Sequence, residues 1–67
     1  MRRELLAALE DVIVETAQEM GSDGVPSGTV YAALMTYGVD LNTYNVILDD
    51  LKRQGRITLS ANVIHAV

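Results

Sequence analysis

The order of helix, turn and strand patterns in residues 25–67 constrains the fold of this chain more than any other feature. Two short helical patterns meet at the tetrapeptide Tyr37-Gly38-Val39-Asp40, and the second pattern ends at Gly55. Glycine readily adopts the left-handed backbone conformation that ends a helix, so each of these glycines marks a boundary. Two strand-like runs follow Gly55 at once. The order therefore predicts a helix, a tight turn, a second helix and a hairpin.

The length and composition indicate one small folded domain. The chain has 67 residues, of which 49% are hydrophobic, so we expect a single domain over residues 1–67. A domain of this size gains little stability from its own core, which favours a homodimer, and we expect that dimer to form through the first helix. No apolar run approaches the roughly 20 residues that span a bilayer, so we expect a cytoplasmic protein without membrane contact.

The first helix is predicted over about residues 2–20 and is followed by Gly21. Val14 falls off its main apolar stripe, which leaves two interpretations: a single exposed apolar residue, or part of a helix–helix dimer seam with Ala7 or Leu6. The predicted core-facing stripe has spacings of three and four and comprises Leu5, Leu6, Leu9, Val12, Ile13, Ala17 and Met20.

The net charge of −4 belongs to this first helix and the segment after it. Residues 1–24 carry two arginines and six carboxylates, whereas residues 25–67 carry three of each sign. Asp11, Glu15 and Glu19 repeat at a spacing of four, where like charges repel on a helix. A solvated helix face accounts for this repeat. The alternative is a contact surface for a basic protein partner, which includes the basic residues of another subunit.

Two further helices are predicted over about residues 27–37 and 41–54. Ser27 and Asp40 are their expected N-caps, because each has a side-chain oxygen that accepts a hydrogen bond from a free backbone N–H. The apolar face of the first comprises Val30, Tyr31, Leu34 and Met35 or Tyr37. The face of the second comprises Leu41, Tyr44, Ile47, Leu48 and Leu51.

A β-hairpin is predicted over about residues 56–67, with its turn at Ala61-Asn62. Asn tolerates the positive φ of a tight turn. A two-residue loop would pair Ile57 and Leu59 with Ile64 and Ala66. A three-residue loop would shift the register and turn Val63 and Val67 inward, and the sequence leaves both registers open.

The core and turn residues of this order resemble the winged helix-turn-helix superfamily. The pattern that carries the resemblance is Val30-Tyr31-x-x-Leu34, Gly38, Leu41-x-x-Tyr44-x-x-Ile47-Leu48-x-x-Leu51 and Gly55-x-Ile57. The resemblance covers about residues 4–67. It implies a mostly α fold with a small β-hairpin, in the order α-α-α-β-β. It also implies double-stranded DNA as a partner, and a role in transcription regulation, with the helix at 41–54 entering the major groove.

If the helix at 41–54 enters the major groove, its outward side chains and those near it become candidates for DNA contact. Asn side chains can pair with adenine, hydroxyls near a helix N-terminus can donate to phosphate, and cations can neutralise phosphate. However, the first three turns of the helix at 41–54 contain no Lys or Arg, and the side chains of Asp49 and Asp50 are expected to project outward from that helix. The alternative is a winged-helix protein-interaction module that does not bind DNA. The DNA-contact candidates are Ser27, Thr29, Asn42, Thr43, Asn45, Lys52, Arg53 and Arg56.

No residue pattern points to catalysis, a metal or a cofactor. His65 is the only histidine and there is no Cys, whereas a metal site needs several such ligands. Asp49 and Asp50 are neighbours on a helix and point about 100° apart, so they cannot form a catalytic carboxylate pair. We therefore expect a protein that is not an enzyme.

Overall fold

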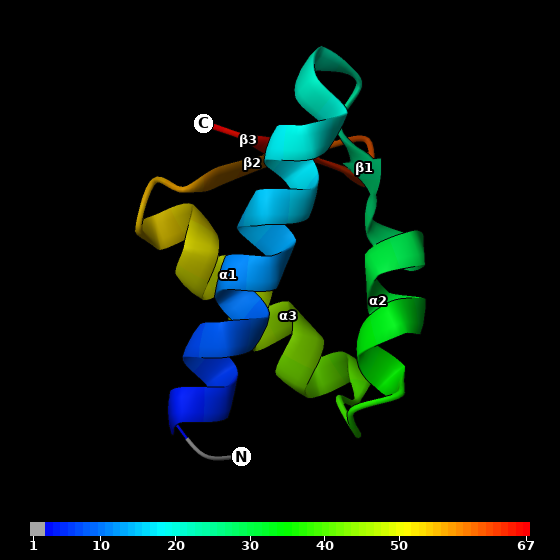
Figure 1. The fold of residues 1–67 in the computed structure, drawn as a ribbon, viewed down its shortest axis with the longest axis vertical. Coiled ribbons are helices and arrows are strands. Elements are labelled where there is room, and N and C mark those ends of the chain that lie inside the picture. Colours follow the sequence, from blue (N-terminus) through cyan, green and yellow to red (C-terminus); the bar gives the residue numbers. More distant parts are fainter. Residues whose placement is uncertain (1–2) are drawn as a thin grey trace.

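The computed structural model describes residues 3–67 and has three helices and three short strands. The strands lie at the end of the molecule that holds the C-terminus, and α1 runs from there to the opposite end (Figure 1). The predicted fold class is confirmed: the chain is mostly helical and has the α-α-α-β-β layout of a winged helix, with one additional strand. The elements are α1 (Arg3–Met20), a 3-10 turn (Gly21–Asp23), β1 (Val25–Pro26), α2 (Ser27–Met35), α3 (Leu41–Arg53), β2 (Ile57–Ser60) and β3 (Val63–Ala66).

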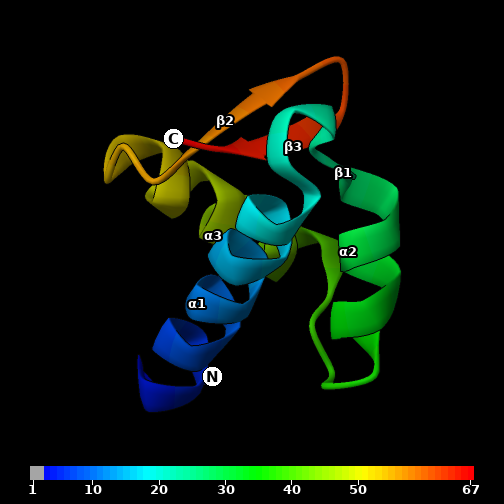
Figure 2. The ribbon, with the colours of Figure 1, turned by 45° about the horizontal axis from the view of Figure 1, so that its top comes forward.

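The three strands form one antiparallel sheet in the order β1-β3-β2. The hairpin has the two-residue loop: Ile57 pairs with Ala66, and Leu59 pairs with Ile64. Figure 2 shows the hairpin running across the top of the molecule from the end of α3 to the start of α2. The residues of its turn, Ala61 and Asn62, have φ of 51° and 62°, as a tight hairpin turn requires. This register excludes the three-residue alternative.

Strand β1 is the element that the sequence did not indicate. It has only two residues, one of them Pro26, and a run this short has no alternating pattern to detect. Val25 pairs with Ile64, and Pro26 pairs with Val63. Pro26 is tolerated because β1 is an edge strand, where a missing N–H need not break a ladder.

Within the described residues α1 covers Arg3–Met20 of the predicted range 2–20, and residue 2 lies outside them; the predicted buried face was wrong in part. Leu9, Ile13 and Ala17 are buried as expected. Glu10 and Val14 are also buried, so the core-facing stripe extends to that side of the helix. The packing of α1 against β3 and α3 determines which edge of a wide apolar stripe becomes buried. The periodicity of the sequence alone cannot predict that edge. Three members of the predicted stripe are exposed instead: Leu5, Val12 and Met20.

Helix α2 is shorter than predicted, because it ends at Met35 and not at about residue 37. Val30 and Leu34 are buried, and the chain then turns through Gly38 at a φ of 81°. Met35 and Tyr37 were expected to complete the apolar face, but both are more than half exposed. Met35 is the last residue of α2 and Tyr37 lies in the turn that follows, and neither side chain is buried in the core.

Helix α3 has the predicted inner face in all but its first residue. Tyr44, Ile47, Leu48 and Leu51 are buried, whereas Leu41 is 55% exposed. Leu41 is the first residue of the helix, and its side chain lies outside the packed core.

The two predicted N-caps differ in outcome. Asp40 is confirmed: its Oδ1 accepts a hydrogen bond from the Thr43 backbone N–H at 2.8 Å, and this bond lowers the pKa of the carboxyl group. Ser27 is not a cap, since it is the first residue of α2 and Pro26 holds the cap position. The Ser27 backbone N–H instead donates to the Asn62 carbonyl at 2.8 Å, which ties α2 to the hairpin turn.

Candidate binding face on helix α3

Helix α3 has an outer face that the rest of the domain leaves open. Its four buried residues lie on one side of the helix, so the residues on the opposite side project outward. Val46 is 59% exposed at the middle of this outer face. Within the part of the chain that the structure describes, the side chains of Asn42 and Asn45 make no hydrogen bond. The outer face comprises Asn42, Asn45, Val46, Asp49, Lys52 and Arg53, all of which are exposed.

An acidic and two basic side chains share the C-terminal half of this face. Lys52 Nζ lies 3.3 Å from Asp49 Oδ1, and both side chains are well exposed. Together with Arg53 they line a shallow hollow. Arg53 has no ion-pair partner among residues 3–67. The i,i+3 pair is exposed and therefore contributes little to stability, so water or another ligand can displace it readily.

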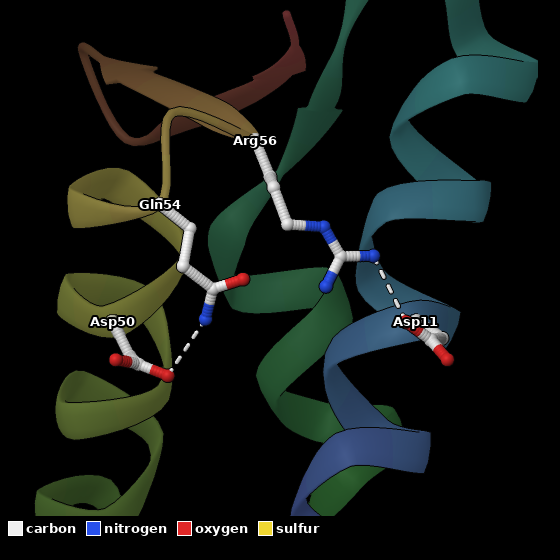
Figure 3. Close-up of polar contacts among 4 residues, drawn as sticks. All are labelled: Asp11, Asp50, Gln54 and Arg56. Carbon is white, nitrogen blue, oxygen red and sulfur yellow. Dashed lines mark hydrogen bonds and ion pairs between the residues drawn. The ribbon is translucent and has the colours of Figure 1, made fainter.

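Arg56 follows α3 and points away from the outer face, toward α1. Figure 3 shows its guanidinium reaching the Asp11 carboxylate, with Nη2 2.9 Å from Oδ1. One predicted DNA-contact residue and one predicted partner-contact residue are therefore bonded to each other. The pair crosses 45 positions of sequence and joins the α3–β2 connection to α1. No local spacing rule indicates such a pair.

Glu10 is a residue that the sequence analysis missed. It is only 7% exposed, and its Oε2 has no hydrogen-bond partner. Burial raises the pKa of its carboxyl group, and the neighbouring Asp50 raises it further, while Gln54 and Arg56 oppose these effects. The sequence did contain a signal, because Glu10 lies three and four positions before Ile13 and Val14 and so shares their helix face.

Asp50 and Gln54 belong to the same polar region. Gln54 Nε2 donates to Asp50 Oδ2 at 2.9 Å. Figure 3 shows this pair at the C-terminal end of α3, while the Arg56 side chain extends toward Asp11 on α1. Asp50 is half-buried and faces α1. It was predicted to project outward beside Asp49, and that prediction was wrong. Only Asp49 places a carboxylate on the outer face of α3.

The hydroxyl residues at the start of α2 do not join the α3 face. The Ser27 Oγ lies 2.9 Å from the Tyr44 hydroxyl, which itself donates to the Ser27 carbonyl at 2.9 Å. Burial raises the pKa of Tyr44, and the bond with Ser27 opposes this shift. The Ser27 hydroxyl therefore bonds to Tyr44 on the inner side of α3 and does not lie on the outer face. Thr29 is exposed, and Thr43 is half-buried beside the α3 N-cap.

The acidic candidates Glu15 and Glu19 lie exposed on α1. Neither has an ion-pair partner in the described residues. His65 is half-buried on β3. Over residues 3–67 no three His, Cys, Asp or Glu side chains are placed so that they could hold a metal ion.

Searches against protein-family models, curated proteins and solved structures each return no match to this chain. None of the helices in residues 3–67 has the length and apolar character needed to cross a membrane.

Proposed function

We propose that this chain is a small DNA-binding protein of the winged-helix type, a cytoplasmic transcriptional regulator without enzymatic activity. The observation that carries the proposal is the open outer face of α3. Its N-terminal half presents two Asn amides that are free of internal hydrogen bonds within the described residues, with exposed Val46 beside them. A helix is about 10–12 Å across with its side chains, which suits a major groove about 12 Å wide.

The chemistry of this face fits the edges of A·T pairs. An Asn amide donates to and accepts from adenine, so Asn42 and Asn45 supply that pattern, and the Val46 methyls pack on a thymine methyl. Lys52 and Arg53 follow in the last turns, where they reach phosphate. Arg56 is held by Asp11 and is not assigned to DNA. Ser27 is likewise not assigned, because its hydroxyl bonds with Tyr44.

The electrostatics of the face limit the affinity. Asp49 lies between the Asn residues and the cations, and the net charge of the chain is −4. Observed affinity falls with salt by a slope of about −0.9 on a log–log scale for each phosphate neutralised. Lys52 and Arg53 thus give a slope of about −2 for one protomer. Binding is expected to be weak and detectable mainly at low salt.

A variant series with a labelled random-sequence duplex tests the proposal by fluorescence anisotropy at low salt. Asn45→Ala and Arg53→Ala should weaken binding, while Asp49→Asn should strengthen it by removing repulsion and releasing Lys52. Glu15→Gln is the matched control: it removes one negative charge from α1, far from the α3 face, and should change affinity less than Asp49→Asn does. If no variant binds, or if Glu15→Gln has the same effect as Asp49→Asn, the proposal is wrong.

A second candidate is a protein-interaction module. It is favoured by three large apolar residues, Met35, Tyr37 and Leu41, which are 54–65% exposed around the α2–α3 connection. Contiguous exposed apolar surface commonly marks a protein contact. Glu15 and Glu19, exposed on α1, would add attraction for a basic partner. Poly-lysine is a simple probe of that attraction: retention that falls in Glu15→Gln and Glu19→Gln, together with no DNA binding, would favour this candidate over the first.

A further inference from the structure

Three carboxyl groups and one guanidinium gather where α1 packs against the C-terminal half of α3. Glu10 and Asp11 are neighbours on α1, Asp50 lies on α3, and Arg56 lies in the connection that follows α3. Figure 3 shows the Arg56 side chain extending to Asp11, while Asp50 lies on the α3 side. The ion pair that Arg56 makes within residues 3–67 is the one with Asp11. Neither Glu10 nor Asp50 is therefore bonded to a cation in the described part of the chain.

Glu10 is the most buried residue of this group. It is 7% exposed, its Oε2 has no hydrogen-bond partner, and it shares its helix face with the buried Ile13 and Val14. An ionised carboxylate costs far more to bury than a neutral carboxyl group, because here no donor replaces the water that it loses. Burial therefore favours the protonated form of Glu10, which carries an O–H group that needs an acceptor.

The Asp50 carboxylate is an acceptor within hydrogen-bonding reach of Glu10. Asp50 is half-buried and faces α1, and its Oδ2 accepts from Gln54 Nε2 at 2.9 Å. Its Oδ1 accepts no hydrogen bond from the described residues, so it is open to a proton donor. Two carboxylates this close repel each other when both are ionised, whereas one bound proton turns the pair into an O–H···O⁻ hydrogen bond.

We propose that Glu10 and Asp50 share one proton across the α1–α3 contact, and that this proton makes the packing of the two helices sensitive to pH. The shared proton gives the buried Glu10 carboxyl group the hydrogen bond that it otherwise lacks. Gln54 already holds the Asp50 side chain from within α3, so the acceptor is in place. The cluster takes a proton and not a metal ion, since over residues 3–67 no three His, Cys, Asp or Glu side chains are placed to hold one.

The other charged groups around Glu10 do not replace this proton. Arg3 is on the same side of α1 but lies seven positions earlier, about 10 Å along the helix axis. On β3, Ile64 is buried and points inward, so the adjacent His65 points to the opposite face of the sheet. Strand β1 has no charged residue. Arg56 attracts Glu10 but makes its ion pair elsewhere on α1.

The direction of the pH dependence follows from the environment of Glu10. Burial, and then the neighbouring Asp50, raise the pKa of Glu10 above its ordinary value of 4.5. The shared proton is therefore present at acid pH and is lost as the pH rises through the folded pKa of Glu10. Above that pH the two ionised carboxylates repel each other across the contact, and α1 and the C-terminal half of α3 are held together less tightly.

A pH titration of the side-chain carboxyl carbons by NMR tests the shared proton. Glu10 and Asp50 should titrate together, in two steps that belong to the pair. Asp50→Asn should reduce the Glu10 titration to one step at a lower pH, because the second negative charge is gone. Asp49→Asn is the matched control: it removes the neighbouring carboxylate, which lies on the outer face of α3, and it should leave the Glu10 titration unchanged. A wild-type Glu10 that titrates in one step, or that responds equally to both variants, overturns the shared proton.

Amide hydrogen exchange tests the pH-sensitive packing, with rates corrected for the intrinsic pH dependence of exchange. The protection of α1 and α3 amides in the wild type should fall as the pH rises through the Glu10 titration. In Glu10→Gln this fall should be smaller, because the side-chain amide cannot ionise. An equal pH dependence in the two proteins would overturn the proposed sensitivity of the packing. Both measurements use the protein without DNA, so their results are independent of the proposed function.

Discussion

Replacement of the buried Glu10 by Gln should stabilise the protein at neutral pH. Glu10 is 7% exposed, its Oε2 has no partner, and Asp50 adds a second negative charge nearby. The ionised carboxylate is therefore poorly solvated and repelled. Gln has nearly the same shape and carries no charge, and its amide can donate to the Asp50 carboxylate. The attraction of Arg56 for Glu10 is lost, but it is smaller than the opposing effects.

The magnitude follows from the cost of the unpaired atom. A buried polar atom without a hydrogen bond costs about 1–3 kcal/mol. Glu10→Gln removes this cost, but it also removes the attraction between Glu10 and Arg56, which reduces the gain. We expect a gain of about 1 kcal/mol in the free energy of unfolding at pH 7. For a domain of this size, that gain raises Tm by about 4–8 °C. The effect is large beside the roughly 3–5 kcal/mol that such a small core supplies.

The pH dependence of the stability difference between Glu10→Gln and the wild type distinguishes this explanation from a stabilisation that is independent of the Glu10 charge. The pKa of Glu10 is raised in the folded state above its ordinary value of 4.5, so the folded state binds this proton more tightly than the unfolded state. Stability from the protonated form is present below 4.5 and is lost as pH rises through the folded pKa. The advantage of Glu10→Gln should thus be near zero below that pH and grow toward neutral pH.

Urea unfolding followed by circular dichroism at a series of pH values measures this difference. Glu15→Gln is the matched control, because it removes the same charge from an exposed position on the same helix. Its effect should stay within about 0.5 kcal/mol at every pH. The reasoning is refuted if Glu10→Gln destabilises the protein at pH 7, if its gain is the same at acid pH, or if the control gives an equal gain.

Three further predictions concern backbone and core contacts, each measured as a change in unfolding free energy. Gly24→Ala should cost more than Gly55→Ala, because both have positive φ but only at position 24 would a Cβ lie 2.7 Å from the Ile64 carbonyl oxygen. Ala61→Gly should gain up to about 1 kcal/mol, since Ala61 holds a left-handed φ of 51°. Tyr44→Phe should cost about 1–2 kcal/mol, because it removes the buried hydroxyl that bonds to α2.

The order of elements could be predicted from sequence because local residues determine it. Gly38 and Gly55 adopt positive φ where the chain turns, and Asp40 caps α3 as expected. Of the five residues that the apolar spacing of α3 predicted to face the core, four are buried. These features depend on neighbours within one or two turns, which a sequence pattern contains.

The details that failed depend on contacts between distant segments. Val14 and Glu10 are buried because β3 and α3 cover that side of α1, and neither packing partner is near them in sequence. Ser27 does not cap α2 because the helix begins at Ser27 itself, with Pro26 in the cap position, and its polar groups bond to Tyr44 and Asn62. The choice of hairpin register likewise needed the paired strands themselves.

The candidate site was predictable in its location but not in its charge pattern. Asn42, Asn45 and Arg53 share the outer face of α3, as the helical spacing implies. The removal of Arg56 from that face by Asp11 could not be predicted, because the two residues are 45 positions apart. This pair leaves two cations at the face where three were expected.

The salt dependence of duplex binding tests the central claim most directly. The anisotropy of a labelled random duplex should rise with protein at about 20 mM salt, and the affinity should fall toward about 200 mM with a log–log slope of about −2 per protomer. A slope near −3 would mean that Arg56 also binds phosphate, which contradicts its assignment to Asp11. No binding at about 10⁻⁴ M protein in low salt would contradict the claim that the outer face of α3 binds DNA.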